Sequence, residues 1–480
     1  MTNSVTIPVW LFLVLSLCAI VVLFRGVVFP LWAGFWGART RKTVEKINPH
    51  LQLHLSPFSL SRRRVLADRL LRDRMVEAGI EEIARDRGVS VDKTQREAWR
   101  IAWDIVPAFN PYFYFRIGYA MARRCLRSLY RFQVAFEDKD TMADVSDKAA
   151  VVFIIHHRSN IDYAVVNYLT VGRTMLSFGV GEWSRVWPIQ PLMRMAGGYF
   201  VRRDSGDPLY RLLLKRYVQL ATEARVPHAV FLEGQLSPDG CVGTAKLGLL
   251  SYVTEHFDAG HTPDLIFMPV GINYDRIPED ENLQRFSSED FRAKGRKYVL
   301  LQGVQFLIRV LWEMLFGRRS FGYACAKFGK PISFAAWLKE ADVTWPDLTR
   351  EQRFSWVSKL GTRLTAELST LVPATPVAVL CRIWFDDASL TLDRAELEVR
   401  FKALCVELKQ RGCHVVLVND TETATLDHAL KLAIPRKIIL KNQDGVFHLN
   451  AEMRRLAVYN ANALSEYLER PRQPPPGLPE

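Results

Sequence analysis

Cysteine is scarce in this 480-residue sequence, and no pattern in the chain pairs it. The seven cysteines stand singly, without a CxxC motif; they are Cys18, Cys125, Cys241, Cys325, Cys381, Cys405 and Cys413. Such an odd, dispersed set excludes a disulfide scaffold and is typical of reduced core thiols in a cytosol-facing protein. No cysteine has a second cysteine or a histidine at the spacing of a zinc ligand set, so we expect no metal site.

The composition also lacks the marks of a disordered or fibrous chain. Hydrophobic residues make up 49% and charged residues 24%, which is enough to bury a core. Acidic residues are outnumbered, because 64 Lys and Arg face 51 Asp and Glu, for a net charge of +13. Residues 1–75 hold eleven basic and three acidic residues beside the most apolar segment. This placement indicates an anionic membrane surface, and we expect no nucleic-acid partner.

One segment is apolar enough to cross a membrane. Ile7 to Phe24 is eighteen residues without a charge, thirteen of them Ile, Val, Leu or Phe. At about 1.5 Å per residue it spans roughly 27 Å. A cleaved signal peptide is the alternative, but no basic residue precedes the run. We therefore expect a membrane anchor over 1–36, with the aromatic stretch 27–36 in the headgroup layer. Basic residues follow the span, which places the rest of the chain in the cytosol.

The hydrophobic pattern divides the remainder into parts. Residues 37–148 form a basic region with apolar positions at helical spacing. The continuous apolar run 149–155 is typical of a strand buried on both faces, as are 228–232 and 264–270, with a helical pattern at 208–224 between them. This alternation predicts an α/β domain over 149–335, in which helices flank a sheet.

Residues 336–470 are predicted to form a helical and α/β extension. The stretch 337–369 predicts helices, with Pro346 starting one of them. Apolar runs at 378–385 and 414–418 flank a helical pattern at 396–410 and indicate strands. The apolar stretch 297–316 contains Arg309 and Glu313, which favours a core or membrane-facing helix over a second span. The tail 471–480 is Pro-rich and predicted to be disordered.

The sharpest candidate for chemistry is the run from His156 to Asp162, HHRSNID. It follows the strand 149–155, and the carboxyl ends of strands are where α/β sheets bind ligands. A histidine and an aspartate five residues on can pair, so that the carboxylate orients the imidazole while it removes a proton. The alternative is a capped turn, because Ser159, Asn160 and Asp162 all suit a helix N-cap.

Three further blocks contain candidate binding residues. GGYFVRR, which ends in Arg202 and Arg203, predicts a cradle for a phosphate or a CoA diphosphate, or else a turn followed by solvated arginines. Glu233 and Gly234 close another strand, where a carboxylate can orient a substrate hydroxyl, although a simple turn fits equally well. The last of these blocks, with Pro269, ends the strand 264–270 and indicates little alone.

Taken in order, the four blocks resemble the motifs of the glycerolipid acyltransferases. HHRSNIDY is similar to the first motif, GGYFVRR to the second, FLEGQLSPDG to the third and FMPVGINYD to the fourth. The resemblance is closest to bacterial membrane-bound glycerol-3-phosphate acyltransferases, and it covers about 60–480, more loosely in the last hundred residues. It implies an acyltransferase-type mixed sheet flanked by helices, preceded by the membrane helix and a helical lead-in.

The resemblance also implies roles for individual residues. His157 would be the general base and Asp162 its orienting partner, while the hydroxyl of the acceptor attacks the thioester carbonyl of acyl-CoA or acyl-carrier protein. Arg202 and Arg203 would bind the acceptor phosphate. The other residues expected at the substrate site are Arg158, Ser159, Gly198, Glu233, Gly234, Lys246 and Pro269, the last on the acyl-donor side.

The third motif departs from the family pattern. The family usually has Glu-Gly-x-Arg-Ser-Arg, but here Glu233-Gly234 is followed by Gln-Leu-Ser-Pro, so both basic residues are missing. Each charge-assisted contact to a phosphate contributes about 1.5–3 kcal/mol, so this loss should weaken glycerol-3-phosphate binding. Lys246 or Arg158 would have to compensate, or the acceptor differs.

We therefore expect a membrane-bound enzyme of phospholipid biosynthesis that acylates the sn-1 hydroxyl of glycerol-3-phosphate. Its partners would be membrane lipids and the acyl donor, acyl-CoA or acyl-carrier protein, without a bound cofactor. Its place would be the bacterial inner membrane, with the catalytic domain in the cytoplasm. The alternatives are an acyltransferase for a lysophospholipid or another alcohol, and a catalytically silent protein that binds acyl-CoA or lipid.

Overall fold

The computed structural model describes residues 40, 42–137, 149–181, 184, 185, 187, 189–202, 205–280 and 321–468. Four predictions fall outside these residues: the membrane span Ile7–Phe24, the interfacial stretch 27–36, the apolar helix at 297–316 and the tail 471–480. Among the described residues, no helix is both long and apolar enough to span a bilayer.

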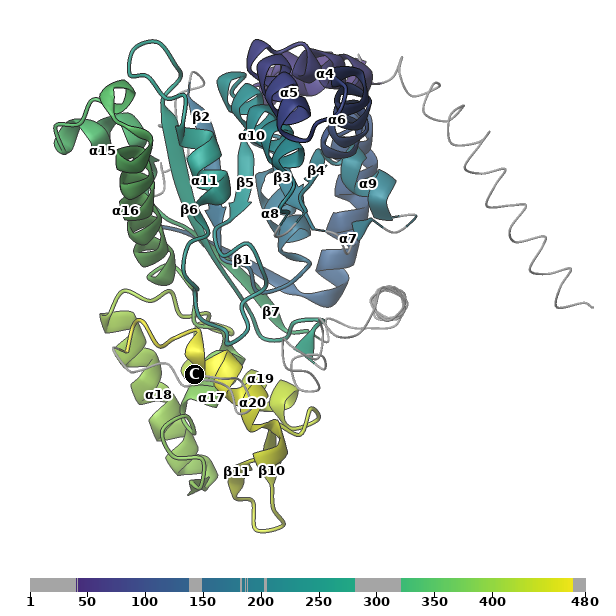
Figure 1. Ribbon diagram of the computed structural model, residues 1–480. Coiled ribbons are helices and arrows are strands. Elements are labelled where there is room, and N and C mark those ends of the chain that lie inside the picture. Colours follow the sequence, from purple (N-terminus) through teal and green to yellow (C-terminus); the bar gives the residue numbers. More distant parts are fainter. Residues whose placement is uncertain are drawn as a thin grey trace, which may run out of the picture.

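Eight strands of the described chain form one mixed sheet. They are β1 (Arg131–Phe136), β2 (Ala150–Ile155), β3 (Ser177–Val180), β4 (Gly198–Phe200), β5 (His228–Phe231), β6 (Leu265–Tyr274), β7 (Tyr323–Phe328) and β8 (Ile332–Ser333). Their order is β1-β7-β6-β2-β5-β3-β4, with β8 beside β6 (Figure 1). β6 runs antiparallel to β7 and β8, whereas the other neighbours are parallel. The predicted α/β sheet is confirmed, although β1 lies in the segment that was predicted to be helical.

Helices cover both faces of this sheet. The hydrophobic core on one face includes residues of α3 (Pro57–Leu60), α4 (Arg63–Leu71), α5 (Arg74–Asp86), α6 (Val91–Ile105), α10 (Pro208–Glu223), α11 (Leu247–Thr254), α15 (Phe334–Glu340) and α16 (Arg350–Ser369). The other face packs against α7 (Tyr119–Leu129), which continues the π-helical turn Phe113–Gly118, and α8 (Asp162–Thr170). α9 (Ile189–Met195) leads into β4, and short 3-10 turns lie at Asn48–His50 and Trp345–Asp347.

The central strand β2 shows why an unbroken apolar run is needed here. All six of its residues are buried. Val152 and Ile154 belong to the core on the α10 face, whereas Val151, Phe153 and Ile155 belong to the core on the α8 face. Because successive side chains of a strand point to opposite faces, a strand with helices on both sides must be apolar at every position.

Several helices begin at polar residues that cap their first turn. The Asp207 carboxylate accepts a hydrogen bond from the Leu209 amide at 3.0 Å, and Pro208 starts α10. Thr349 and Gln352 form a reciprocal capping box at the start of α16. Pro346, which was predicted to start a helix, lies in the 3-10 turn that precedes α16. The long helix itself starts at Arg350.

The C-terminal region has a hydrophobic core of its own. It comprises α17 (Pro376–Arg382), α18 (Arg394–Gln410), α19 (Glu422–Ala433), the 3-10 turn Ala451–Met453 and α20 (Arg454–Asn462), together with β9 (Thr391–Leu392), β10 (Ile439–Lys441) and β11 (Phe447–Leu449). The three strands form an antiparallel sheet in the order β10-β11-β9. This region lies at one end of the large sheet, below β7 in Figure 1.

Three strand predictions need correction. The run 378–385 is largely the helix α17, whose residues are all buried, and a helix buried on every side is as apolar as a buried strand. The run 414–418 makes only isolated bridges, from Val415 and Val418. Pro269 does not end its strand, because β6 continues to Tyr274. It lies where the antiparallel partner of β6 changes from β8 to β7, a place that tolerates a residue without an amide hydrogen.

Candidate active site

The carboxyl ends of four parallel strands meet at one edge of the large sheet. β2, β5, β3 and β4 are neighbours in this order and all run in the same direction. His157 follows β2, Glu233 follows β5, Arg185 follows β3 and Arg202 follows β4. The first three sequence blocks are therefore brought to the same edge.

The His157 and Asp162 side chains form the predicted pair. The Nδ1 atom of His157 lies 3.0 Å from Oδ2 of Asp162, the first residue of α8. The same oxygen accepts hydrogen bonds from the backbone amides of Arg158 at 2.7 Å and Ser159 at 2.8 Å. The other oxygen, Oδ1, accepts a hydrogen bond from the hydroxyl of Tyr274 at 2.5 Å. Four donors therefore hold one carboxylate that is completely buried.

The imidazole of His157 is held from two further sides. Its ring centroid lies 4.1 Å from that of Phe231, the last residue of β5, and the Tyr163 ring meets it edge-on at 5.8 Å. Because Asp162 can only accept at Oδ2, Nδ1 of the neutral ring carries the hydrogen and Nε2 carries the lone pair. No hydrogen bond from a described residue reaches Nε2. The ring thus has the tautomer that a general base requires.

His156, the adjacent histidine, has a different environment. It is completely buried, and its Nε2 lies 3.1 Å from the carbonyl oxygen of Cys241, to which it donates. Burial and the nearby Arg158 charge lower the pKa of His156 well below its usual value. Its Nε2 also lies 3.6 Å from Oε1 of Glu233. Because the imidazole is neutral at neutral pH, this contact is not an ion pair. His156 is thus a neutral structural residue, and His157, the second histidine of the motif, is the candidate for the base.

Glu233 links the third sequence block to the first. Its Oε1 accepts the backbone amide of His157 at 3.3 Å, and the side chain is almost fully buried. Burial raises the pKa of Glu233 to about 8, in spite of the amide hydrogen bonds from His157 and Gly243. Ser237 donates its backbone amide to the carbonyl of His157 at 2.8 Å. Glu233 thus supports the loop that carries His157.

Glu279 supports the other side of the same loop. Its carboxylate accepts hydrogen bonds from the hydroxyl of Ser159 at 2.7 Å and from the amide and side chain of Asn160, both at 2.9 Å. Burial raises the pKa of Glu279 to about 7. Ser159, which was predicted to bind substrate, is completely buried and engaged with Glu279.

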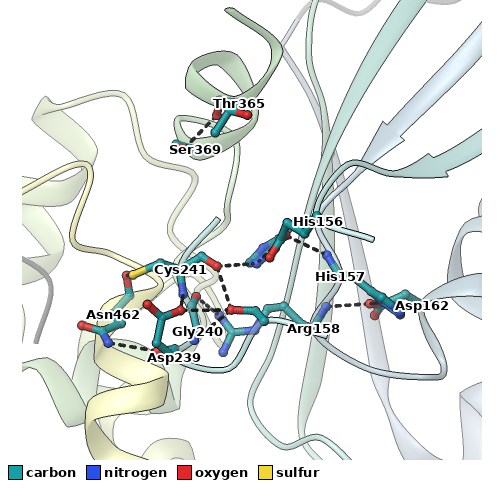
Figure 2. A network of polar contacts seen from close by, with 12 residues as sticks. His156, His157, Arg158, Asp162, Asp239, Gly240, Cys241, Thr365, Ser369 and Asn462 are labelled. Atoms are coloured by element: carbon teal, nitrogen blue, oxygen red, sulfur yellow. Dashed lines mark hydrogen bonds and ion pairs between the residues drawn. The ribbon is translucent and has the colours of Figure 1, made fainter. Parts of the chain in front are cut away.

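Arg158 connects the motif loop to the C-terminal region. Its guanidinium is buried, donates to the carbonyl of Gly240 at 3.2 Å and lies 4.6 Å from the centre of the Tyr459 ring of α20. Asn462, also on α20, donates to the carbonyl of Asp239 at 2.9 Å. Figure 2 shows the hydrogen bonds of this network, which extend from Asp162 through Arg158 and Gly240 to Asp239 and Asn462. Arg158 is thus turned toward the C-terminal region and does not join Arg202.

Arg202 lies in a separate basic cluster. Its Nη2 is 3.3 Å from Oδ2 of Asp104, near the end of α6, and its guanidinium lies 5.1 Å from the centre of the Tyr210 ring. Arg185 and Arg194 bind the same carboxylate. Arg203, predicted to act with Arg202, lies outside the described residues.

The other residues predicted at the substrate site differ in how deeply they are buried. Gly234, at φ +64°, turns the chain after β5, and a Cβ there would contact the exposed Lys246 side chain at 3.4 Å. These two residues thus lie close to Glu233. Gly198 is buried in β4, where a Cβ would lie 2.7 Å from the Val180 side chain, so it serves packing. Pro269 is buried within β6.

Residues important to this site were missed in the sequence. Tyr274 stood in the fourth block without an assigned role, and Glu279, Asp104, Arg185 and Arg194 belonged to no motif. Tyr274 is 112 positions from Asp162, and Glu279 is 120 positions from Ser159. Contacts over such separations leave no local pattern, so no signal in a single sequence could have identified them.

Two family models match consecutive parts of the chain. Residues 133–273 match the acyltransferase model, and residues 307–468 match the model of the glycerol-3-phosphate acyltransferase C-terminal region. Among solved structures, the 1-acyl-sn-glycerophosphate acyltransferase of Thermotoga maritima is similar with a TM-score of 0.30 and 16% identity, covering 57% of this chain and 82% of that one.

Curated proteins named glycerol-3-phosphate acyltransferase are similar over most of this chain. The one from Aeromonas hydrophila is 24% identical over 79% of this chain and 47% of its own length. The one from Ectopseudomonas mendocina is 26% identical over 70% of this chain and 40% of its own length. The chain therefore spans less than half the length of these relatives. The matches confirm the resemblance to the glycerolipid acyltransferases that the four sequence blocks indicated.

Proposed function

We propose that this protein transfers a fatty acyl group from acyl-CoA or acyl-carrier protein to the sn-1 hydroxyl of glycerol-3-phosphate. The observation that carries the proposal is the His157–Asp162 pair, with Nδ1 to Oδ2 at 3.0 Å, at the carboxyl edge of the sheet. The similarity to proteins named glycerol-3-phosphate acyltransferase supports the choice of acceptor.

The arrangement performs the transfer in two proton steps. Nε2 of His157 takes the proton of the acceptor hydroxyl, whose oxygen attacks the thioester carbonyl carbon. The buried Asp162 carboxylate stabilises the imidazolium that forms. The tetrahedral intermediate then breaks its carbon–sulfur bond, and the departing thiolate receives the proton from Nε2. The acceptor hydroxyl is itself the nucleophile, so the site needs no serine or cysteine nucleophile.

Thiol release by the purified protein tests this proposal. Acyl-CoA and acyl-carrier protein would each be supplied with glycerol-3-phosphate, with lysophosphatidic acid and with no acceptor. We expect glycerol-3-phosphate to drive release, and His157→Ala to slow it by about 10²- to 10⁴-fold. His261→Ala, at an exposed histidine outside the four blocks, is the matched control and should keep full activity.

Each other result has a definite meaning. Release with lysophosphatidic acid alone would show that the acceptor is wrong but the chemistry right. Release that survives His157→Ala would contradict the role of the pair. No release with any donor and acceptor would contradict the proposed enzyme activity and favour a silent lipid-binding protein.

We also propose that Ile7–Phe24 anchors the protein in the bacterial inner membrane, with the catalytic part in the cytoplasm. The basic residues that follow this run support the orientation. The full chain and a variant lacking residues 1–36 would be compared in membrane fractions washed with alkaline carbonate. Retention of the full chain and release of the shortened variant are expected, and equal behaviour of both would contradict the anchor.

A further inference from the structure

Three arginines share a single carboxylate at the carboxyl ends of β3 and β4. Nη1 of Arg185 lies 2.8 Å from Asp104 Oδ2, Nη2 of Arg194 lies 3.1 Å from Oδ1, and Nη2 of Arg202 lies 3.3 Å from Oδ2. No other carboxylate of the described residues pairs with any of the three. One negative charge therefore faces three positive charges, and the cluster keeps a surplus of two.

A fourth arginine adds to this surplus. Arg63 on α4 donates through Nε to the carbonyl of Val106 at 3.2 Å, and Nη1 of Arg194 donates to the same carbonyl at 3.1 Å. Its guanidinium lies 4.1 Å from the centre of the Trp103 ring. Burial, followed by the charge of Arg194, lowers the pKa of Arg63 to about 9. Arg63 thus lies close enough to Arg194 for the two cations to repel each other.

The cluster also contains donors that no protein group accepts. Nε and Nη2 of Arg185 are buried and have no hydrogen-bond partner among the described residues. Buried donors are normally satisfied, so these two nitrogens can accommodate a further acceptor. An anion with several oxygens, such as a phosphate monoester, would satisfy these donors and neutralise the surplus charge.

The cluster lies on the same edge of the sheet as His157. From β2, which carries His157, the strands continue to β5, β3 and β4. Three strand spacings amount to about 14 Å between the backbones of β2 and β4. His157 follows β2 and Arg202 follows β4, so their side chains start at the two ends of this interval. The two side chains and a small phosphorylated polyol between them are together long enough to span it.

We propose that Arg185 and Arg194, together with Arg202, bind the phosphate monoester of the acceptor in place of the basic residues that the third motif lacks. The inference rests on the proposed function, since it names the phosphate site of that reaction. Asp104 orients the three guanidinium groups and leaves them with the net positive charge that binds the anion. Arg158 and Lys246, considered earlier as replacements, lie outside the cluster.

Arg185→Gln tests the site, because Arg185 is partly exposed and contributes the unsatisfied donors. KM for glycerol-3-phosphate and KM for acyl-CoA would be measured separately. We expect the first to rise by about tenfold or more and the second to change less than about twofold, with Arg185→Lys in between. Arg211→Gln, at an exposed arginine of α10, is the matched control and should change neither.

The two KM measurements distinguish a phosphate of the acceptor from a phosphate of CoA. A rise in KM for acyl-CoA alone would mean that the cluster binds a phosphate of CoA, and it would overturn the assignment to the acceptor. Unchanged KM values in Arg185→Gln, in a variant with the melting temperature of the parent, would overturn the site altogether.

A binding measurement keeps this test independent of turnover. Inorganic phosphate and glycerol-3-phosphate are each expected to raise the melting temperature of the parent protein, and to raise that of Arg185→Gln less. If the protein shows no acyl transfer but this difference is present, the proposed function fails while the phosphate site stands. Equal shifts in both proteins, or none in either, would overturn the site.

Discussion

The hydroxyl of Tyr274 lies 2.5 Å from Oδ1 of Asp162. Tyr274 is the last residue of β6, and Asp162 is the first residue of α8. Burial and the Asp162 charge raise the pKa of Tyr274 well above its usual value, so the phenol stays protonated and donates to the carboxylate. The fourth sequence block therefore acts on the first through the aspartate that orients His157.

Replacing Tyr274 with phenylalanine should slow acyl transfer without weakening substrate binding. The buried Oδ1 of Asp162 would lose its donor, and a hydrogen bond to a charged group contributes about 1.5–3 kcal/mol. We expect kcat to fall by about tenfold and KM for both substrates to stay within about twofold. Tyr130→Phe, which removes the hydroxyl of a neighbouring buried tyrosine bound to the carbonyl of Arg276, is the control. An equal loss of kcat in both variants would argue against a specific effect of Tyr274.

Asp162→Asn should affect both catalysis and stability. An amide at this position lacks the charge that stabilises the imidazolium, and its NH2 group replaces one of the two oxygens that accept from the four donors. We expect kcat to fall by about 10²- to 10⁴-fold and the melting temperature to drop. Asp264→Asn is the comparison, because Asp264 accepts from Ser333 and Ala335 at the opposite end of β6. It should lower stability and keep kcat, and a full kcat in Asp162→Asn would contradict the mechanism.

The two buried glutamates predict how stability depends on pH. The pKa of Glu233 is raised to about 8 and that of Glu279 to about 7, in each case mainly by burial. A raised native pKa means that the folded protein binds the proton more tightly than the unfolded chain, in which the pKa of glutamate is about 4.3. This contribution to stability is complete below that value and is lost as the pH rises toward about 8.

Urea unfolding between pH 5 and 8 would measure the effect. We expect the free energy of unfolding of the parent protein to fall over this range, by a few kcal/mol at most. Glu233→Gln combined with Glu279→Gln should flatten the dependence, because the amides do not titrate. Glu340→Gln, at an exposed glutamate, should leave it unchanged. An unaltered slope in the double variant would contradict the assignment of these carboxyl groups.

Gly240→Ala should disrupt the packing of the C-terminal region against the segment that follows β5. Gly240 has φ +89°, and a Cβ there would lie 2.0 Å from the carbonyl oxygen of Tyr459. Gly260 has φ +93° with no atom within 4 Å of a Cβ, so Gly260→Ala reports the backbone cost alone, about 1–2 kcal/mol. We expect Gly240→Ala to cost clearly more in unfolding free energy and also to lower kcat. Equal costs in the two variants would show that this packing contributes little.

The sequence alone determined the features that depend on near neighbours in the chain. The run 149–155 is apolar at every position because both faces of β2 are buried, so the strand could be predicted. His157 and Asp162 are five residues apart across one turn, so their pairing could be predicted as well. The same logic failed at α17, where a helix buried on all sides is as apolar as a strand.

The order of the strands in the sheet decided the rest. It brought Tyr274 to Asp162, Glu279 to Ser159, and Arg185, Arg194 and Arg202 to Asp104. These partners come from different strands and helices, and each pair is separated by about eighty residues or more. Hydrophobic periodicity reports which face of an element is buried but not which element it meets. His157 and Asp162 therefore belong to one sequence motif. The groups that hold them, and the cluster proposed to bind phosphate, come together only in the folded chain.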